Sequence, residues 1–115
     1  MNATRYDEYR PLEVHVSAGP DEVRVAPAGE VDLASAGLLR ERIGALHGER
    51  ARLVLDLRDV SFMDSTGVRL MLDLAREATG EAWELSVINV PSAVHRVFEL
   101  CGVLDALRLG EPEVV

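Results

Sequence analysis

The chain has 115 residues, of which 48% are hydrophobic and 28% charged, and it carries a formal net charge of −8 with a pI near 4.8. This length suits one compact domain, and the apolar content excludes a disordered chain. The acidic balance argues against binding to the nucleic acid backbone, which needs clustered cations. The sequence contains neither the apolar run of a membrane span nor the apolar N-terminus of a signal peptide. We therefore expect a cytoplasmic globular protein that binds neither nucleic acid nor membrane.

The N-terminal part of the chain predicts a hairpin followed by a helix. The stretches "LEVHV" from Leu12 and "EVRVA" from Glu22 alternate apolar and polar residues, with the turn residues "SAGPD" between them. Pro27 lies at the end of the second predicted strand, where its missing N–H either faces away from a partner strand or marks a bulge. After "GEVD", we expect a helix in which Asp32 caps the first turn and Gly48 ends the last. Its apolar residues at helical spacing are Ala36, Leu39, Ile43 and Leu46.

The rest of the chain alternates between predicted strands and helices. "RLVLDL" from Arg52 has the apolar run of a central strand covered on both faces, and "WELSVI" from Trp83 predicts another strand. Between them lies a second helix. Pro91 suits the first turn of a third helix, which Gly102 ends, and "LDALRL" predicts a last short helix. The buried stripe expected on the third helix is Val94, Val97, Phe98 and Cys101.

This order of elements predicts an α/β fold. Strand–helix–strand alternation implies right-handed crossovers and a mostly parallel central sheet, to which the N-terminal hairpin adds an antiparallel edge and on which the helices pack. We expect a single domain over residues 1–115, with its core at about residues 12–109. Cys101 is the single cysteine, so an internal disulfide is excluded, and its apolar neighbours predict a buried, unreactive thiol.

The segment "SFMDSTGVRLMLDLA" (Ser61–Ala75) places the small or polar residues Ser65, Thr66 and Gly67 between apolar flanks. Asp64 and Ser65 stand where a loop meets a helix, so either side chain can cap the free N–H groups of the first turn. Alternatively, Ser65 is a site of modification, because a phosphate there would meet the same N–H groups and the positive end of the helix dipole. The residues alone leave both interpretations open.

The helix that follows this segment is apolar over about half of its circumference, more than the ~100° that docking on a sheet requires. Its apolar residues are Val68, Leu70, Met71, Leu72, Leu74, Ala75 and Ala78. Leu70 and Leu74 lie at the edge of this stripe. They either form an exposed apolar patch beside Ser65 or are covered by a neighbouring helix or by the N-terminal segment.

Enzymatic sites find no support in the sequence. Ser65 is not in a G-x-S-x-G elbow, and "DSTG" lacks the glycine-rich loop and lysine of a P-loop. His15, His47 and His95 have no spacing that indicates a catalytic triad or a metal site. We therefore predict that the protein is not an enzyme and has no catalytic residue, metal site or cofactor.

The stretch "LVLDLRDVSFMDSTG" with its apolar helix, preceded by "GEVD", resembles the STAS domain of bacterial anti-sigma factor antagonists. The resemblance runs from Leu12 to about Leu109 and includes "PSAVHRVFELCGV". It implies that Ser65 is phosphorylated by a partner anti-sigma factor, a serine kinase that itself binds the nucleotide and Mg²⁺. Unphosphorylated antagonists of this family capture the anti-sigma factor and release the sigma factor, and a PP2C-type phosphatase restores that form.

The resemblance also implies a binding site for this partner. By position, Asp64 helps to orient the acceptor serine, and Asp32 lies near it at the same end of the sheet. Pro27 departs from the family pattern, in which the residues before "GEVD" continue the strand. The residues expected to bind the partner are Asp32, Asp64, Thr66, Gly67, Arg69, Leu70 and Leu74. The alternative is a constitutive binding module of a transport or signalling assembly, in which Ser65 serves mainly as a cap.

Overall fold

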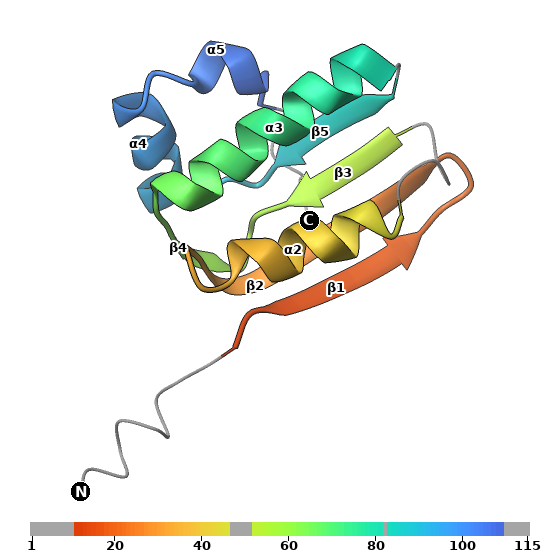
Figure 1. The fold of residues 1–115 in the computed structure, drawn as a ribbon, viewed down its shortest axis with the longest axis horizontal. Coiled ribbons are helices and arrows are strands. Elements are labelled where there is room, and N and C mark those ends of the chain that lie inside the picture. Colours follow the sequence, from red (N-terminus) through yellow and green to blue (C-terminus); the bar gives the residue numbers. More distant parts are fainter. Residues whose placement is uncertain (1–10, 47–51, 82, 110–115) are drawn as a thin grey trace, which may run out of the picture.

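A computed structural model describes residues 11–46, 52–81 and 83–109 of the chain. These residues form a mixed α/β domain around a five-stranded sheet (Figure 1). The strands are β1 (Glu13–Ala18), β2 (Glu22–Val31), β3 (Arg52–Asp56), β4 (Val60–Met63) and β5 (Glu84–Ile88). The helices are α2 (Ala36–Gly44), α3 (Ser65–Glu81), α4 (Ser92–Leu100) and α5 (Leu104–Leu107).

The sheet is mostly parallel, with one antiparallel edge, as the sequence predicts. Its strand order is β1-β2-β3-β5, and β4 pairs with β2. β1 and β2 form the antiparallel hairpin, whereas β2–β3, β2–β4 and β3–β5 are parallel pairs. The central strand β3 is buried from Leu53 onward, which confirms that its apolar run is covered on both faces.

Pro27 lies inside β2 and not at its end, so the sequence prediction for this strand was too short. β2 pairs with β3 as far as Val25 and with β4 from Gly29 onward, and Pro27 falls between these two ladders. The break in parallel pairing thus coincides with the residue that has no N–H. The register of the β2–β4 pair shifts between Gly29 and Glu30, and Gly29 has a φ of 122° that favours glycine.

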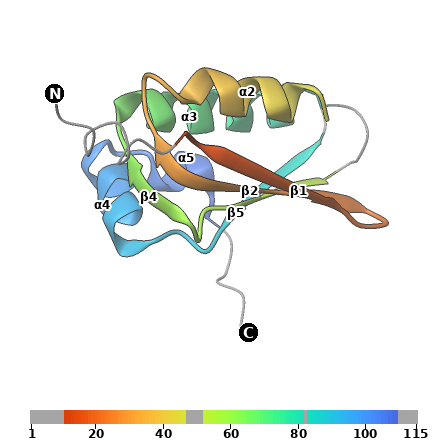
Figure 2. The same ribbon diagram turned by 90° about the horizontal axis from the view of Figure 1, so that it is seen from below.

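The helices enclose the core against the sheet. α2 and α3 lie side by side on one face, while α4 packs against β4 and α5 against α3 (Figure 2). The largest fully buried side chains include Leu39, Leu55, Met71 and Phe98, which come from α2, β3, α3 and α4. None of the helices in the described ranges has the length and hydropathy needed to cross a membrane.

β4 is an element that the sequence did not predict, because a loop was expected between the central strand and the second helix. Only its outer residues, Val60 and Met63, are buried, while the two between them are exposed. A strand this short lacks the alternation by which strands are recognised. β4 nevertheless determines where α3 begins, since the helix starts two residues after Met63.

The C-terminal end of α4 confirms one prediction and overturns another. Gly102 has a φ of 70°, and it ends the helix with two hydrogen bonds of 3.1 Å, from its own N–H to the carbonyl of Glu99 and from the N–H of Val103 to that of Phe98. Cys101 was expected to be buried but is exposed, because the helix ends at Leu100 and the buried stripe does not extend to the cap. The predicted helix stop at Gly48 and the histidine at position 47 lie outside the described residues.

Candidate functional site

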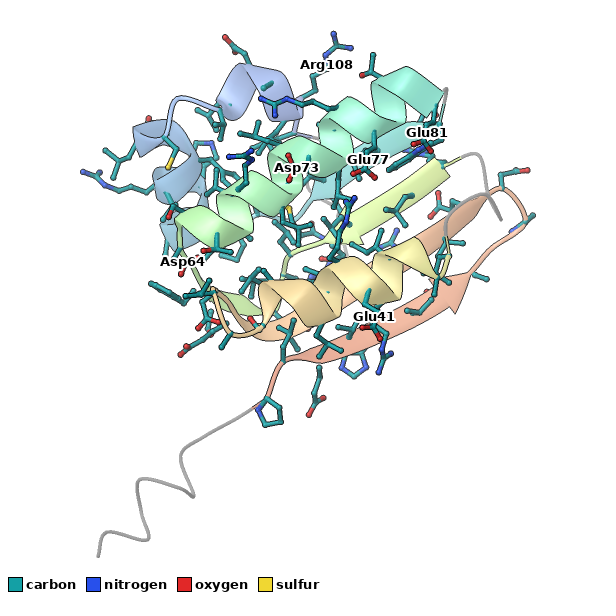
Figure 3. All side chains as sticks on the ribbon, viewed as in Figure 1. Glu41, Asp64, Asp73, Glu77, Glu81 and Arg108 are labelled. Atoms are coloured by element: carbon teal, nitrogen blue, oxygen red, sulfur yellow. The ribbon has the colours of Figure 1, made fainter. Side chains whose placement is uncertain are left out.

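Asp64 caps the N-terminus of α3. Its Oδ1 accepts hydrogen bonds from the backbone N–H groups of Thr66, at 2.8 Å, and Gly67, at 3.2 Å. The N–H of Asp64 donates to the carbonyl of Val31 at 3.2 Å, which ties the cap to the end of β2. Figure 3 shows Asp64 at the start of the helix. Of the two residues that the sequence offers as the cap, Asp64 therefore has this role.

Ser65 is the first residue of α3, and it is exposed. Within the described part of the chain its hydroxyl makes no hydrogen bond, so it is not required to hold the helix start. The structure also corrects the expectation that a phosphate on Ser65 would meet free N–H groups of the first turn. Those of Thr66 and Gly67 are already bound by Asp64, and that of Val68 donates to the Asp64 carbonyl at 3.1 Å.

Asp32 lies at the same end of the sheet as Asp64, at the edge formed by the carboxyl ends of β2 and β4, as the resemblance implies. Val31 and Met63 are paired across β2 and β4, and each aspartate directly follows one of them. Asp32 Oδ1 accepts hydrogen bonds from the N–H groups of Ala34 (3.0 Å) and Ser35 (3.1 Å). These residues precede α2, so Asp32 caps the turn before the helix and not its first turn. Its side chain is half-buried and holds this loop in place.

Gly67 is buried and cannot contact a partner, contrary to its place among the predicted binding residues. A Cβ atom at this position would lie 2.5 Å from Met63 Cγ and 2.9 Å from the Val31 carbonyl oxygen. The glycine thus permits α3 to approach the ends of β2 and β4 closely. The neighbouring Thr66 is half-buried.

Leu70 and Leu74 are also buried, with exposed fractions of 6% and 1%, so the apolar patch that they were expected to form beside Ser65 does not exist. The alternative prediction holds, because α2 packs against α3 on the same face of the sheet. Arg40 of α2 and Glu77 of α3 form an ion pair across the two helices. α3 therefore buries side chains both against α2 and against the sheet.

Two other apolar side chains are exposed at this edge. Leu33 follows Asp32 and is 81% exposed, and Phe62 of β4 is 49% exposed. Neither residue is among the binding residues expected from the sequence. The available signal was a leucine in the loop after "GEVD" and an aromatic residue three positions before Ser65.

The surroundings of this edge are acidic. A groove of about 580 Å³ runs past the beginning of β1, the bulge of β2 and the loop before α2, and its charged lining residues are Glu13, Glu30, Asp32 and Asp59. In the described ranges no group of three or more His, Cys, Asp or Glu side chains is arranged to hold a metal ion. The edge therefore offers carboxylates and exposed apolar groups for contact with another molecule.

Arg69 is the predicted binding residue that is both charged and exposed on α3. Its Nε lies 3.4 Å from Asp73 Oδ1, and the same carboxylate oxygen lies 3.7 Å from Nη1 of Arg76. Figure 3 shows Asp73 further along the helix from Asp64. Both Arg69 and Asp73 are accessible to solvent, so this ion pair is weak.

Comparison with known proteins relates the chain to one family. The family model described as "Mlab, STAS domain" matches residues 14–109. The anti-sigma-B factor antagonist of Bacillus subtilis is 31% identical over 99 residues, which are 86% of this chain and 91% of that protein. An anti-sigma factor antagonist from Mycobacterium paratuberculosis has a TM-score of 0.74 and 25% identity, covering 90% of this chain and 87% of that one. The fold also matches Bacillus SpoIIAA in its phosphorylated form, with a TM-score of 0.68, 22% identity, and coverage of 88% and 92%.

Proposed function

The chain belongs to the STAS domain family, and from this premise we propose that it is an anti-sigma factor antagonist that is inactivated by phosphorylation of Ser65. The observation that carries the proposal is the division of roles at the start of α3. Asp64 makes the cap, while the adjacent Ser65 hydroxyl is exposed and makes no hydrogen bond within the described residues. The hydroxyl can thus act as the phosphate acceptor in the active site of another protein without loss of the helix start.

The chemistry requires a kinase as partner, and this chain is its substrate. The partner, an anti-sigma factor with serine kinase activity, supplies ATP and Mg²⁺. Ser65 Oγ attacks the γ-phosphorus, the new O–P bond forms as the bond to the β-phosphate oxygen breaks, and ADP leaves with that electron pair. The hydroxyl proton passes to a base of the kinase. A PP2C-type phosphatase hydrolyses the resulting ester and restores the serine.

Phosphorylation affects binding far more than folding. The phosphate adds about −1.5 to −2 charges, and the helix dipole at the start of α3 stabilises it by roughly 0.3–1 kcal/mol. The fold therefore tolerates the group at this exposed position. Enclosing the same dianion in an interface without a matching cation costs several kcal/mol, and each ~1.4 kcal/mol lowers the affinity tenfold.

The proposed binding surface differs in part from the one expected from sequence. Ser65, Asp32 and Asp64 remain in it, because they share the edge formed by the ends of β2 and β4. The exposed side chains of Leu33 and Phe62 take the place of the buried Leu70 and Leu74. The matching face on the anti-sigma factor is apolar at its centre and basic at its rim, since carboxylates surround this edge.

Affinity capture from lysate of the native host tests the proposal, with wild type, Ser65→Ala, Ser65→Asp and Ser17→Asp as parallel baits. Ser17 is exposed on β1, where it pairs with Arg24 near the beginning of β2, so Ser17→Asp adds the same charge at the opposite edge. We expect wild type, Ser65→Ala and Ser17→Asp to hold a small kinase-like protein that Ser65→Asp loses. The purified partner with ATP and Mg²⁺ should then phosphorylate wild type at Ser65 and leave Ser65→Ala unmodified.

Either of two results would contradict the proposal. Equal retention of the same proteins by all baits would identify a constitutive binding module in which Ser65 has no switching role. If the captured kinase modifies a residue other than Ser65, the protein has a kinase partner but Ser65 is not the phosphorylated residue. Mass spectrometry of the tryptic peptides locates the phosphate in either case.

A further inference from the structure

Arg69 is placed to reach a phosphate on Ser65. The two residues are four positions apart on α3, so their side chains lie on one face of the helix, one turn apart. A helical side chain leans toward the N-terminus of its own helix, so the turn that begins at Ser65 is within reach of Arg69 when its guanidinium leaves Asp73. Its side chain is 72% exposed, and it is the only basic residue in α3 before Asp73.

The present partner of Arg69 holds it weakly. The ion pair with Asp73 has a separation of 3.4 Å between Nε and Oδ1, and both side chains are open to solvent. In a helix an acid four residues before a base is the more favourable order, and Arg69–Asp73 has the reverse order. Asp73 has a second cation, Arg76, at 3.7 Å. Its carboxylate therefore still has an ion-pair partner if Arg69 moves away.

A phosphate on Ser65 would provide Arg69 with the better partner. Its order along the helix, acid before base, is the favourable one, and its charge exceeds that of a carboxylate. The N–H groups of Thr66 and Gly67 are not available to this phosphate, because Asp64 already binds them. An arginine guanidinium is a strong donor to phosphate oxygens.

We propose that Arg69 is the intramolecular partner of phosphorylated Ser65, and that phosphorylation draws its guanidinium from Asp73 to the phosphate. This inference rests on the proposed function, in which Ser65 is the modified residue. Arg69 is thereby a positioning residue of the phosphorylated state. It fixes the orientation of the phosphate at the start of α3 and neutralises part of its charge.

The test is the second pKa of the phosphate, measured by ³¹P NMR on protein with phosphoserine genetically incorporated at position 65. The ordinary value is about 6, and a nearby guanidinium lowers it because it stabilises the dianion. We expect Arg69→Gln to raise this pKa by about 0.3 pH units relative to the parent, the phosphoserine protein that keeps Arg69. In Arg69→Lys the phosphate pKa should lie between these two values. Arg76→Gln is the matched control, since it removes the same charge from the same helix almost two turns further on than Arg69.

Other charges near this edge act equally on all these variants. They include the carboxylates of Glu30, Asp32, Asp59 and Asp64, the guanidinium of Arg58 and, on α4, which packs against β4, the exposed side chains of His95, Arg96 and Glu99. A difference between Arg69→Gln and Arg76→Gln therefore reports Arg69 alone. In the parent, the Nε–H resonance of Arg69 should move with the same midpoint as the phosphate signal.

Identical phosphate pKa values in the Arg69→Gln and Arg76→Gln proteins would overturn the inference, as would an Arg69 Nε–H resonance that does not follow the phosphate. The phosphoserine is installed during synthesis, so the result does not depend on whether a kinase modifies Ser65. Failure here leaves the proposed function intact, and failure of the capture experiment leaves this measurement valid.

Discussion

Asp64 and Ser65 are adjacent in the sequence but differ in what they contribute to the folded chain. The carboxylate of Asp64 binds two backbone N–H groups and its own N–H is bound to β2, whereas the hydroxyl of Ser65 projects from the same turn into solvent. The sequence could place a cap at one of these positions but could not choose between them. The choice follows from β4, which fixes Asp64 beside Val31.

Because of this difference, we expect substitutions of Asp64 and Ser65 to have unequal effects on the free energy of unfolding. Asp64→Ala should lower the free energy of unfolding by about 1 kcal/mol, because it removes the cap of α3. Ser65→Asp should change it by less than about 0.5 kcal/mol, because the new side chain remains in solvent. Urea denaturation followed by circular dichroism measures both. A large loss of stability in Ser65→Asp would mean that the charge unfolds the domain and does not act on an interface.

Substitution of Gly67 tests how closely α3 packs against the ends of β2 and β4. Gly67→Ala should destabilise the protein by roughly 1–3 kcal/mol, because the added methyl group meets Met63 and the Val31 carbonyl. Gly80→Ala in the same helix is the control, since a Cβ there has no atom within 4 Å, and it should stabilise by about 0.5–1 kcal/mol through helix propensity. Equal effects of the two substitutions on the urea midpoint would contradict the close packing of α3 described here.

At the scale of the element, strands and helices with strong local signals were predictable. Alternation identified β1, the apolar run identified β3, and Pro91 and Gly102 marked the two ends of α4. β4 was not predictable because its stability comes from pairing with β2, far away in the sequence. The continuation of β2 beyond Pro27 was not predictable for the same reason, since from Gly29 onward that strand pairs with β4.

The proposed binding surface is the part of the site that the sequence predicted least well. The apolar width of α3 was recognised, but the sequence could not show that α2 covers Leu70 and Leu74. Conversely, Leu33 and Phe62 stand in segments without clear periodicity, and only the fold shows that both are exposed where β2 and β4 end.

These two side chains lead to a prediction about binding. Leu33→Ser and Phe62→Ser should each lower the affinity for the anti-sigma factor captured by wild type about tenfold, because each removes an apolar contact of more than ~1 kcal/mol. Val16→Ser is the control, since Val16 of β1 is 44% exposed, close to the 49% of Phe62, and lies away from this edge. Isothermal titration calorimetry gives the three affinities, and a loss as large for Val16→Ser would refute the assignment of the surface.

At the scale of the whole molecule, charge determines how partners approach. Part of the excess negative charge, which totals −8, lies at the carboxyl end of β2, where Glu30, Asp32 and Asp59 line the groove. Cations on the neighbouring elements include Arg58, Arg69 and Arg96. A partner with a basic rim is therefore attracted to this edge before contact.

Association kinetics should reflect this field. We expect the association rate constant of the complex to fall as salt rises, and Asp59→Asn to lower it at low ionic strength, since removal of one carboxylate weakens the attraction. Glu84→Gln, at the opposite, amino-terminal end of β5, should have little effect. Stopped-flow measurements at several salt concentrations compare the three proteins. A rate constant independent of salt would show that the partner does not present a basic surface.

The exposure of Cys101 has a practical consequence for such measurements. The chain has one cysteine, so an accessible thiol at the end of α4 can be oxidised to a disulfide only with a second molecule. Covalent dimers that form on storage should vanish on addition of a reductant and should not be taken as a native assembly. Under reducing conditions the same thiol is a unique attachment point for a maleimide dye. It lies at the C-terminal end of α4, which packs against β4, so the unmodified sequence already carries a site for a fluorescent reporter.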